Sequence, residues 1–380
     1  MVNINIFGDF CVRNLDSLTF GDSLQSILDS GDINVLNFEA PIYVANEQAI
    51  PKSGPSLSQD PDAPCFLGRH NFNMFTLANN HIMDFGKNSA RKTIKAFDDF
   101  VTLGCGIWKD AYQYKIIKVK GKSIGFLALT QYEFGVLGEK QFDNFGTAWL
   151  CHPCVDELII EAKSHCDCLI LLPHAGLEHF DYPLPELCTL YRHFINIGVD
   201  AVIGNHPHVP QPWECYNDSL IIYSLGNFAF DALESQNKWW YYGLMAQLNI
   251  DQDNRIIVGV SSIAYDKEKR VADCCNDEKL SRHLEYINNI FTDTDRYIQE
   301  VNKHCLSLEF LYDYQFECSG YIRPNIRKYT KAIWNRLKGK IFKSNVDQYN
   351  PTHYINNLRC EPHRWVISRI FELKYNTKQI

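Results

Sequence analysis

The sequence predicts an α/β domain followed by a helical extension, and two patterns carry this prediction. Over the first 265 residues, short apolar runs that favour β-strands alternate with helix-compatible stretches, as in a largely parallel sheet covered by helices. From about Asp266 onward, apolar residues recur at helical spacing instead. We therefore expect an α/β domain at 1–265 and a helical, basic extension at 266–380.

Polar side chains follow each predicted strand of the first part. In chain order, the strands and the residues that follow them are Ile4–Phe7 with Asp9, Ile33–Phe38 with Glu39, Met74–Ala78 with Asn80 and His81, Cys168–Leu172 with His174, and Ala201–Ile203 with His206 and His208. In open α/β sheets the ligand site lies beyond the carboxyl ends of the strands. We therefore expect these polar residues to meet in one crevice.

Two helices and a hairpin complete the predicted domain. Ser89–Leu103 and Pro185–Ile197 are compatible with helices, and each is followed by a glycine, which commonly ends a helix. The alternating runs Gly243–Ile250 and Arg255–Ile263 are separated by four polar residues. They predict an antiparallel hairpin that closes the sheet.

The extension combines an apolar helical stripe with a strongly basic segment. The stripe consists of Leu284, Ile287, Phe291, Ile298, Val301 and Cys305. Residues 323–343 hold eight basic and no acidic side chains, and the formal charge is -18 over 1–320 but +10 over 321–380. This asymmetry predicts that the segment 321–343 contacts an anionic membrane or polymer, or else packs on the acidic domain.

The composition is that of a globular protein. Hydrophobic residues make up 46% of the 380 positions, yet no run reaches the roughly 18 apolar residues of a membrane span, and no signal peptide is evident. The fourteen cysteines are therefore expected to be reduced thiols. A zinc knuckle at Cys151, Cys154, Cys166 and Cys168 is the weaker alternative. We expect a cytoplasmic protein, peripheral at the membrane at most, with no nucleic-acid partner.

The polar residues at the strand ends form a mixed set of oxygen and nitrogen donors. The candidate ligands are Asp9, Glu39, Asn80, His174, His206 and His208. Such donors suit Mn, Zn or Fe better than a thiolate site would. Each residue taken singly is also typical of a turn, a helix cap or a surface loop. Their joint occurrence predicts a site for one or two divalent metal ions.

The same motifs resemble a known family, the CapA-type proteins of poly-γ-glutamate capsule synthesis. The segments that carry the resemblance are Gly8-Asp9, Asn37–Glu39, Lys52–Pro55, Leu77–Gly86, Gly204–Val209 and Tyr223–Phe228. The resemblance covers residues 1 to about 265 and implies the fold of calcineurin-like metallophosphoesterases. This is a metallophosphatase-like layered α/β domain, with central mixed β-sheets flanked by helices.

The resemblance also implies which residues bind each metal ion and which residues act in catalysis. Asp9 and His208 would hold one metal ion, Asn80, His174 and His206 would hold a second, and Glu39 would bridge them. His81 is identified with the histidine that protonates the leaving group, and Asp84 would orient it. The substrate-binding candidates are Lys52, His179 and Asn227.

Two departures from the metallophosphoesterase pattern bear on activity. Metallophosphoesterases begin with Asp-x-His, but the position two residues after Asp9 is Cys11, and Glu39 stands where an aspartate is usual. The first hypothesis is a metal-dependent hydrolase of an anionic ester or amide, acting on an anionic polymer or a phosphorylated substrate in surface-polymer metabolism. The second is a noncatalytic, metal-stabilised accessory protein that binds an acidic polymer or a membrane-bound synthase.

Overall fold

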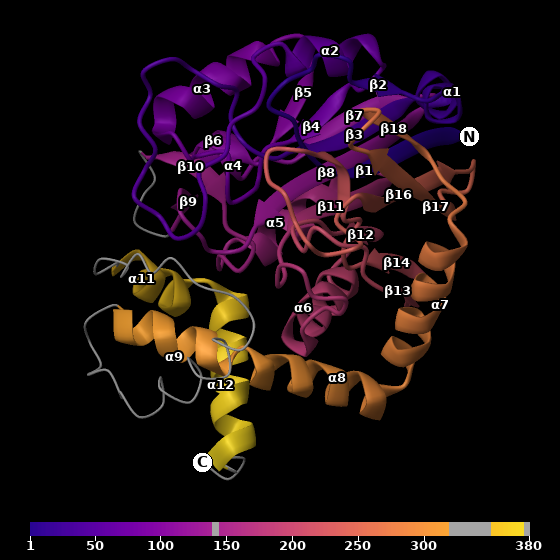
Figure 1. Ribbon diagram of the computed structural model, residues 1–380. Coiled ribbons are helices and arrows are strands. Elements are labelled where there is room, and N and C mark those ends of the chain that lie inside the picture. The colour runs from indigo at the N-terminus through magenta and orange to yellow at the C-terminus, as the bar shows by residue number, and fades with distance from the viewer. Residues whose placement is uncertain (139–143, 319–350, 376–380) are drawn as a thin grey trace. The chain divides into compact units, whose positions relative to one another are not determined.

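The computed structural model of the chain describes residues 1–138, 144–318 and 351–375 (Figure 1). The chain divides into two compact units. The first, here called the α/β unit, comprises Met1–Ile50 and Ser56–Ile298. The second, the helical unit, comprises Gln299–Ile380 together with the short loop Pro51–Pro55. Each unit has its own packing and is described by itself.

A nine-stranded mixed sheet forms one layer of the α/β unit. Eight of its strands are, in spatial order, β2 (Thr19–Phe20), β18 (Val271–Cys274), β17 (Ile256–Asp266), β16 (Tyr242–Ile250), β1 (Val2–Cys11), β3 (Ile33–Phe38), β4 (Met74–Thr76) and β5 (Val101–Leu103). The last four are mutually parallel, and β15 (Asn227–Phe230) also pairs in parallel with β1. β16 and β17 form the antiparallel hairpin that the alternating runs predicted.

A six-stranded sheet forms the second layer. Its order is β13 (Trp213–Tyr216), β14 (Ser219–Ile222), β12 (Ala201–Ile203), β11 (Cys168–His174), β8 (Lys122–Thr130) and β7 (Lys115–Val119). The four central strands are parallel and the two edge strands antiparallel. A small third sheet contains β6 (Cys105–Ile107), β10 (Phe145–Ala148) and β9 (Val136–Leu137).

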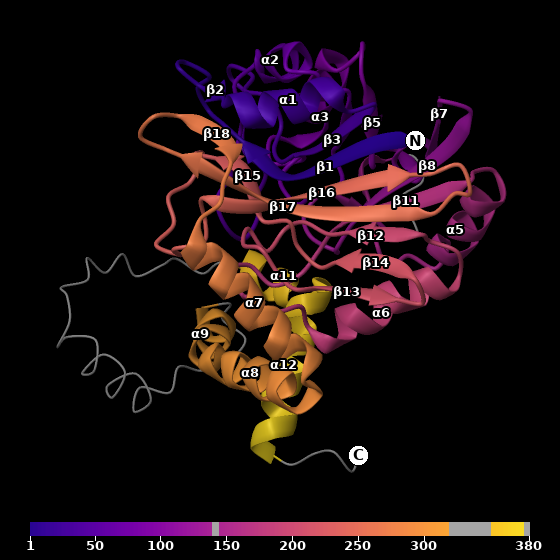
Figure 2. The same cartoon turned by 90° about the vertical axis from the view of Figure 1, so that its right-hand side faces the viewer.

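Helices cover the outer faces of the two large sheets. The nine-stranded sheet carries α1 (Asp22–Ser30), α2 (Ala63–Arg69) and α3 (Gly86–Ala96), and the six-stranded sheet carries α5 (Val155–Ser164) and α6 (Pro185–Asn196). Figure 2 shows these layers edge-on, with the two sheets between the helices. α4 (Trp108–Ala111) follows β6, and α7 (Glu278–Thr292) follows β18. The predicted layered α/β fold with mixed central sheets and helical flanks is confirmed.

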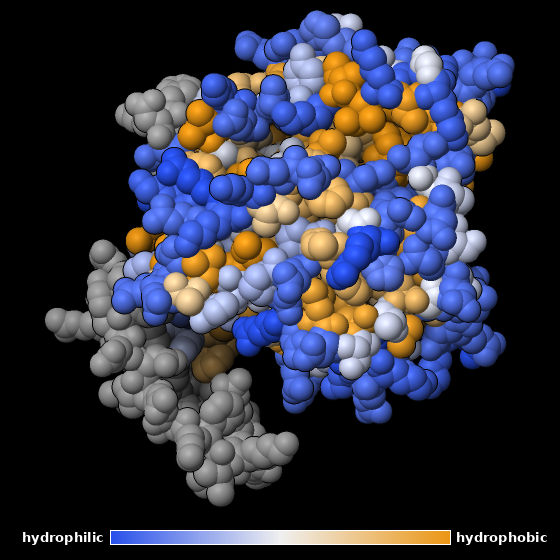
Figure 3. Space-filling model, turned by 90° about the horizontal axis from the view of Figure 1, so that it is seen from above, coloured by the Kyte–Doolittle hydropathy of each residue, from blue (hydrophilic) through white to orange (hydrophobic). Residues whose placement is uncertain are grey.

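Phenylalanine rings fill the core beside β1. Phe7, Phe72 and Phe228 contact one another edge to face, with ring centroids 5.1–5.5 Å apart. All three are at most 1% exposed, so this cluster fixes the strand that carries Asp9. On the outer surface seen from above, hydrophilic residues predominate and hydrophobic ones gather in separate groups between them (Figure 3).

The helix predicted over Ser89–Leu103 is too long. The structure ends α3 at Ala96, and Val101–Leu103 forms β5 beside β4. Val101 and Thr102 are β-branched, and β-branched residues favour strands. Their segment pairs with the edge of β4 that would otherwise have no partner strand.

The apolar stripe of the extension belongs to two helices, because the chain turns at Asp293 between α7 and α8 (Thr294–Ser307). The helical unit also contains α9 (Glu309–Cys318), α11 (Pro351–Arg359) and α12 (Glu361–Tyr375). No helix within the described ranges is both long and apolar enough to cross a bilayer. The basic segment 323–343 lies outside the described residues.

Candidate metal centre

The ends of five strands bring the predicted ligands together. Asp9 lies near the end of β1, Glu39 follows β3, and His174 ends β11. Asn80 lies beyond β4, and His206 and His208 lie beyond β12. These six side chains come from both large sheets and all are at most 4% exposed. The crevice expected from the parallel-sheet pattern is therefore a buried polar cluster between the layers.

Glycine at two positions lets the backbone carry Asp9 into the cluster. A Cβ at Gly8 would lie 1.9 Å from the carbonyl oxygen of Gly226, so only glycine fits between β1 and the segment before β15. Gly226 itself has a φ of +71°, which glycine adopts without steric cost. The close approach lets the backbone N–H of Asp9 donate to the Gly226 carbonyl at 3.0 Å. This backbone hydrogen bond helps to fix the position of Asp9.

Strained backbone occurs at the ligands themselves. His206 has a φ of +104°, His208 of +60° and Ala40, next to Glu39, of +130°. Left-handed conformations cost non-glycine residues about 1–3 kcal/mol and concentrate at functional sites. The His206 backbone N–H points at Asp9 Oδ2 across 3.3 Å. The strain therefore serves to aim the two imidazoles inward.

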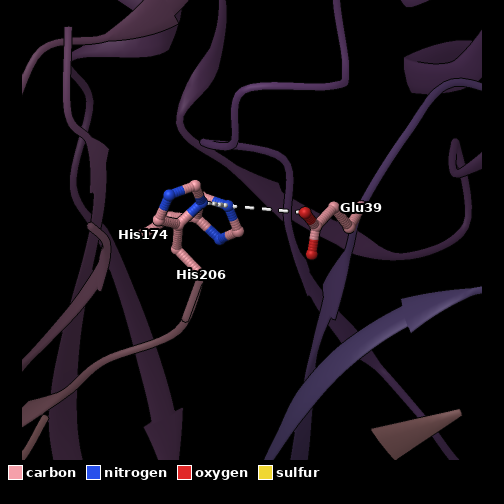
Figure 4. Close-up of side chains that lie close together, drawn as sticks. All are labelled: Glu39, His174 and His206. Atoms are coloured by element: carbon pink, nitrogen blue, oxygen red, sulfur yellow. Dashed lines mark hydrogen bonds and ion pairs between the residues drawn. The ribbon is translucent and has the colours of Figure 1, made fainter. Parts of the chain in front are cut away.

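Glu39 belongs to two groups of candidate ligands. Among the described residues, one group is Glu39, His174 and His206, and the other is Asp9, Glu39 and His208. Within each group one donor atom per residue lies within 4.8 Å of the others. Figure 4 shows the first group, with both imidazoles on one side and the Glu39 carboxylate facing them. Glu39 thus lies where a bridging ligand would.

The distances around Glu39 Oε1 leave room for a cation. His174 Nε2 lies 3.6 Å from this oxygen and His208 Nε2 lies 3.5 Å from it, both beyond a good hydrogen bond. Glu39 Oε1 is buried without a hydrogen-bond partner. An unpartnered buried carboxylate oxygen is costly. Because nitrogen and oxygen donors surround it, this residue set fits a divalent metal ion.

Two asparagines form hydrogen bonds with the candidate ligands. The Asn37 amide donates to Asp9 Oδ1 at 2.7 Å, and its oxygen accepts from the Thr76 hydroxyl at 2.9 Å. Asn227 donates to the Trp240 carbonyl at 2.9 Å, which turns its oxygen toward His208 Nδ1, also 2.9 Å away. With a metal ion bound, His208 would therefore carry its proton on Nδ1 and direct Nε2 toward the ion.

Clustered carboxylates and imidazoles perturb one another's protonation. Burial and the neighbouring Asp9 carboxylate raise the pKa of Glu39 well above its usual range. Burial lowers the pKa of His208, but Glu39 and Asp9 outweigh it and raise that pKa to about 10. Burial and the nearby imidazoles depress the pKa of His174. The ion-free cluster therefore retains protons that a cation would replace.

A histidine–aspartate pair completes the centre. His81 Nδ1 lies 2.7 Å from Asp84 Oδ2, and the two side chains are 5% and 0% exposed. The Asp84 carboxylate also accepts the backbone N–H of Leu57 at 2.7 Å, and its backbone carbonyl accepts that of Ile50 at 2.8 Å. The Asn79 side chain accepts the His81 backbone N–H at 3.2 Å. These bonds fix the orientation of the His81 ring.

The three expected substrate-binding residues lie in different settings. His179 is exposed at the rim, with its ring centroid 6.4 Å from that of His208. Asn227 is 2% exposed and uses both amide atoms within the protein. Its place supports a role in holding His208. Lys52 belongs to the helical unit, where its neighbour Ser53 bonds His353 across 2.7 Å.

Cys11 replaces the histidine of the Asp-x-His pattern but does not join the ligands. Its side chain is fully buried in an apolar cluster with Ala40, Leu57, Phe230 and Trp240. Burial, followed by the Glu39 carboxylate, raises the pKa of its thiol well above the usual range. The neutral thiol acts as a small apolar residue here. Among the described residues, no cysteine belongs to a candidate metal-binding group, including those of the zinc-knuckle alternative.

Sequence reasoning missed several residues around the centre. Gln131 and Glu133 follow β8 and reach His206, with the Gln131 amide nitrogen 2.9 Å from His206 Nε2. Much of the Glu178 residue is exposed but its carboxyl group is buried, and the neighbouring imidazoles of His206 and His208 outweigh that burial and lower its pKa to about 2. The polar residues directly after the apolar run Ile124–Thr130 were a usable signal for the first two. Glu178 follows no strand, and nothing in its sequence neighbourhood indicates the site.

Comparisons with known proteins agree with these motifs. The family model of the bacterial capsule synthesis protein PGA_cap matches residues 15–232. The chain is 30% identical over 213 residues to the PGA biosynthesis protein CapA of Bacillus subtilis, covering 55% of this chain and 56% of that protein. It is 29% identical over 205 residues to the capsule biosynthesis protein CapA of Bacillus anthracis, covering 51% and 49%. The chain thus matches about half the length of these curated relatives.

Solved structures show more distant similarity. A hypothetical protein from Thermus thermophilus is 16% identical, with a TM-score of 0.45 over 69% of this chain and 98% of its own. A putative 5'-nucleotidase from Staphylococcus aureus is 14% identical, with a TM-score of 0.43 over 76% and 58%. A 5'-nucleotidase from Candida albicans is 12% identical, with a TM-score of 0.41 over 71% and 53%.

Proposed function

Because the chain belongs to the family of bacterial capsule synthesis proteins, we propose that its buried centre is that of a metal-dependent hydrolase. The substrate would be an anionic ester or amide of capsule or surface-polymer metabolism, such as a poly-γ-glutamate-like chain or a phosphorylated precursor. The observation that carries the proposal is the unpartnered Glu39 Oε1, shared by two ligand groups beside the His81–Asp84 pair.

The two ligand groups support a proposal of two ions. Asp9 and His208 would hold one, while Asn80, His174 and His206 would hold the other, and Glu39 would contact both. Bound divalent ions would supply Lewis-acid stabilisation of negative charge and lower the pKa of water toward neutrality. The donor set suits Mn, Zn or Fe.

His81 is the proposed proton donor to the leaving group. Its Nδ1 bonds Asp84, so a transferable proton would lie on Nε2. Asp84 would hold the ring in place and stabilise its charged form while the proton is available. The exposed residue His179 would contact the substrate outside the ligands.

The test measures metal content and turnover in the same preparations. Purified protein would be assayed for bound metal, then for hydrolysis of generic phosphoesters and of poly-γ-glutamate. We expect His206→Ala and His208→Ala to lose metal, and His81→Ala to keep metal but lose turnover. Metal-loaded wild type that cleaves neither substrate would contradict hydrolase activity, and unchanged metal content in both ligand variants would contradict the site.

A noncatalytic accessory role is the second candidate, and Cys11 favours it. The apolar packing of this thiol leaves the Asp9–His208 group without the histidine ligand of the Asp-x-His pattern. In this role the metal would stabilise a surface that binds an acidic polymer or a membrane-bound synthase. Bound metal with sedimentation of poly-γ-glutamate but no cleavage would favour this role over hydrolysis.

A further inference from the structure

Gln131 and Glu133 form a polar pair behind His206 that the expected ligand set does not explain. The Gln131 backbone N–H donates to the His174 carbonyl at 3.1 Å, which ties the segment after β8 to the end of β11. The Gln131 side-chain oxygen accepts the Gly176 N–H at 2.8 Å. This bond fixes the orientation of the amide, so its nitrogen is the atom that faces His206.

The amide nitrogen of Gln131 faces two acceptors. It lies 2.6 Å from Glu133 Oε1 and 2.9 Å from His206 Nε2. An amide NH2 has two protons and no acceptor. His206 Nε2 must therefore accept in this arrangement, which places the imidazole proton on Nδ1.

A ligating His206 requires the opposite tautomer. Its Nδ1 lies 3.1 Å from His174 Nε2, the atom that faces Glu39, so Nδ1 is the nitrogen directed at the candidate ion. When Nδ1 coordinates an ion, the proton must lie on Nε2. Nε2–H and the Gln131 amide would then be two donors facing each other. Glu133 Oε1 is 3.8 Å from Nε2, and no other carboxylate oxygen of a described residue lies within 4.0 Å of a ring nitrogen of His206.

We propose that Glu133 is a positioning residue that accepts the Nε2–H of His206 when the metal site is filled. The inference rests on the proposed metal site but not on hydrolysis. Glu133 would select the tautomer of His206, and Gln131 would keep the carboxylate in reach through its 2.6 Å bond. Ligating histidines commonly donate their second N–H to such a carboxylate, and losing the partner typically weakens metal binding about 10- to 100-fold.

Metal affinity tests this role without any assay of activity. Zn²⁺ affinity of the full chain would be measured by chelator competition for wild type, Glu133→Ala, Glu133→Gln and Glu178→Ala. We expect Glu133→Ala to weaken binding about 10- to 100-fold and Glu133→Gln, whose amide oxygen can still accept, to restore part of the loss. Glu178→Ala is the matched control, because it removes a negative charge that also faces His206 but forms no bond with it.

The tautomer itself gives a second readout. Nitrogen NMR of the Zn²⁺-loaded wild type should show His206 protonated at Nε2, and in Glu133→Ala this proton should exchange faster with water. Equal loss of Zn²⁺ affinity in Glu133→Ala and Glu178→Ala would show that the loss comes from removing a negative charge and not from removing an acceptor. That result would overturn the proposal. Unchanged affinity in Glu133→Ala, with His206→Ala still losing Zn²⁺, would overturn it while leaving the metal site intact. A wild type that binds no Zn²⁺, Mn²⁺ or Fe²⁺ would overturn the metal site as well.

Discussion

His81 and Asp84 allow proton donation to be separated from metal binding at single residues. We expect His81→Ala to lower kcat about 10²- to 10⁴-fold, the usual contribution of a positioned acid, without changing metal content. Asp84→Asn should lower kcat less than His81→Ala, because the His81 ring stays in the site and only the Asp84 carboxylate beside it is lost. Turnover and metal analysis of the same samples measure both effects.

The control for these variants is another histidine–aspartate pair. His193 Nε2 lies 2.9 Å from Asp156 Oδ2, but this pair is exposed and does not contact the centre. His193→Ala should leave kcat unchanged. A comparable loss in His193→Ala would show that the His81 effect is not local.

The raised pKa values of Glu39 and His208 predict that metal binding releases protons. Burial and Asp9 raise the pKa of Glu39, and the two carboxylates raise that of His208 to about 10, so the ion-free cluster holds at least one proton at neutral pH. A metal ion needs both groups deprotonated. Affinity should therefore rise with pH up to about pH 10, the value to which the two carboxylates raise the pKa of His208.

Calorimetry in two buffers of different ionisation enthalpy would count the protons released. We expect release in the wild type and less release in Glu39→Gln, which cannot give up a carboxyl proton. Proton uptake, or affinity that falls with rising pH, would contradict the assigned charge states.

At the scale of elements, the approach of β1 to the segment before β15 sets the position of Asp9. An alanine at Gly8 would bring its Cβ within 1.9 Å of the Gly226 carbonyl oxygen, so Gly8→Ala must push the strands apart. We expect this variant to lose metal and to unfold at a lower temperature. Gly259→Ala, whose Cβ would meet only ordinary contacts at 3.4 Å, should change neither. Metal analysis and thermal unfolding of the two variants test the assignment.

Which elements the sequence could predict depended on how local their signals are. The strand that carries Asp9, the hairpin β16–β17 and helix α6 each follow from a short pattern of apolar and turn residues. The end of α3 at Ala96 was mispredicted because β5 forms only by pairing with β4.

The same contrast holds within the site. The six candidate ligands follow predicted strands, and family motifs mark them. Asn37 and Glu133 reach the centre only through tertiary structure. Asn37 points inward because β3 pairs in register with β1, and Glu133 is carried to His206 because β8 pairs with β11. The sequence places Asn37 in a family motif and Glu133 shortly after an apolar run, but only the strand pairing shows which ligand each of them contacts.

At the scale of the whole molecule, charge is divided along the chain. Residues 323–343 carry eight basic side chains and no acidic ones, so we propose that this segment contacts an anionic membrane or polymer. Replacing Lys331, Lys338, Lys340 and Lys343 by glutamine should weaken binding to anionic vesicles at low salt, because each basic residue near such a surface contributes about 1 kcal/mol.

Vesicle sedimentation of intact and substituted chains at two salt concentrations tests this contact. Substituting Lys115, Lys118, Lys120 and Lys122, which lie on and after β7 in the α/β unit, gives a control of equal charge change. Binding by the intact chain that does not depend on salt, or equal loss in both variants, would contradict a role for the segment.

The unpartnered oxygen of Glu39 has a consequence for the lifetime of the protein in a cell. Without an ion, Glu39 Oε1 is buried and has no hydrogen-bond partner, and an ion that binds only the folded state stabilises that state by about 2.7 kcal/mol when its free concentration is a hundred times Kd. Differences of about 1–2 kcal/mol can change the abundance of a protein several-fold through proteolysis of unfolded chains. The amount of this protein would then follow the supply of the metal ion that we propose it binds.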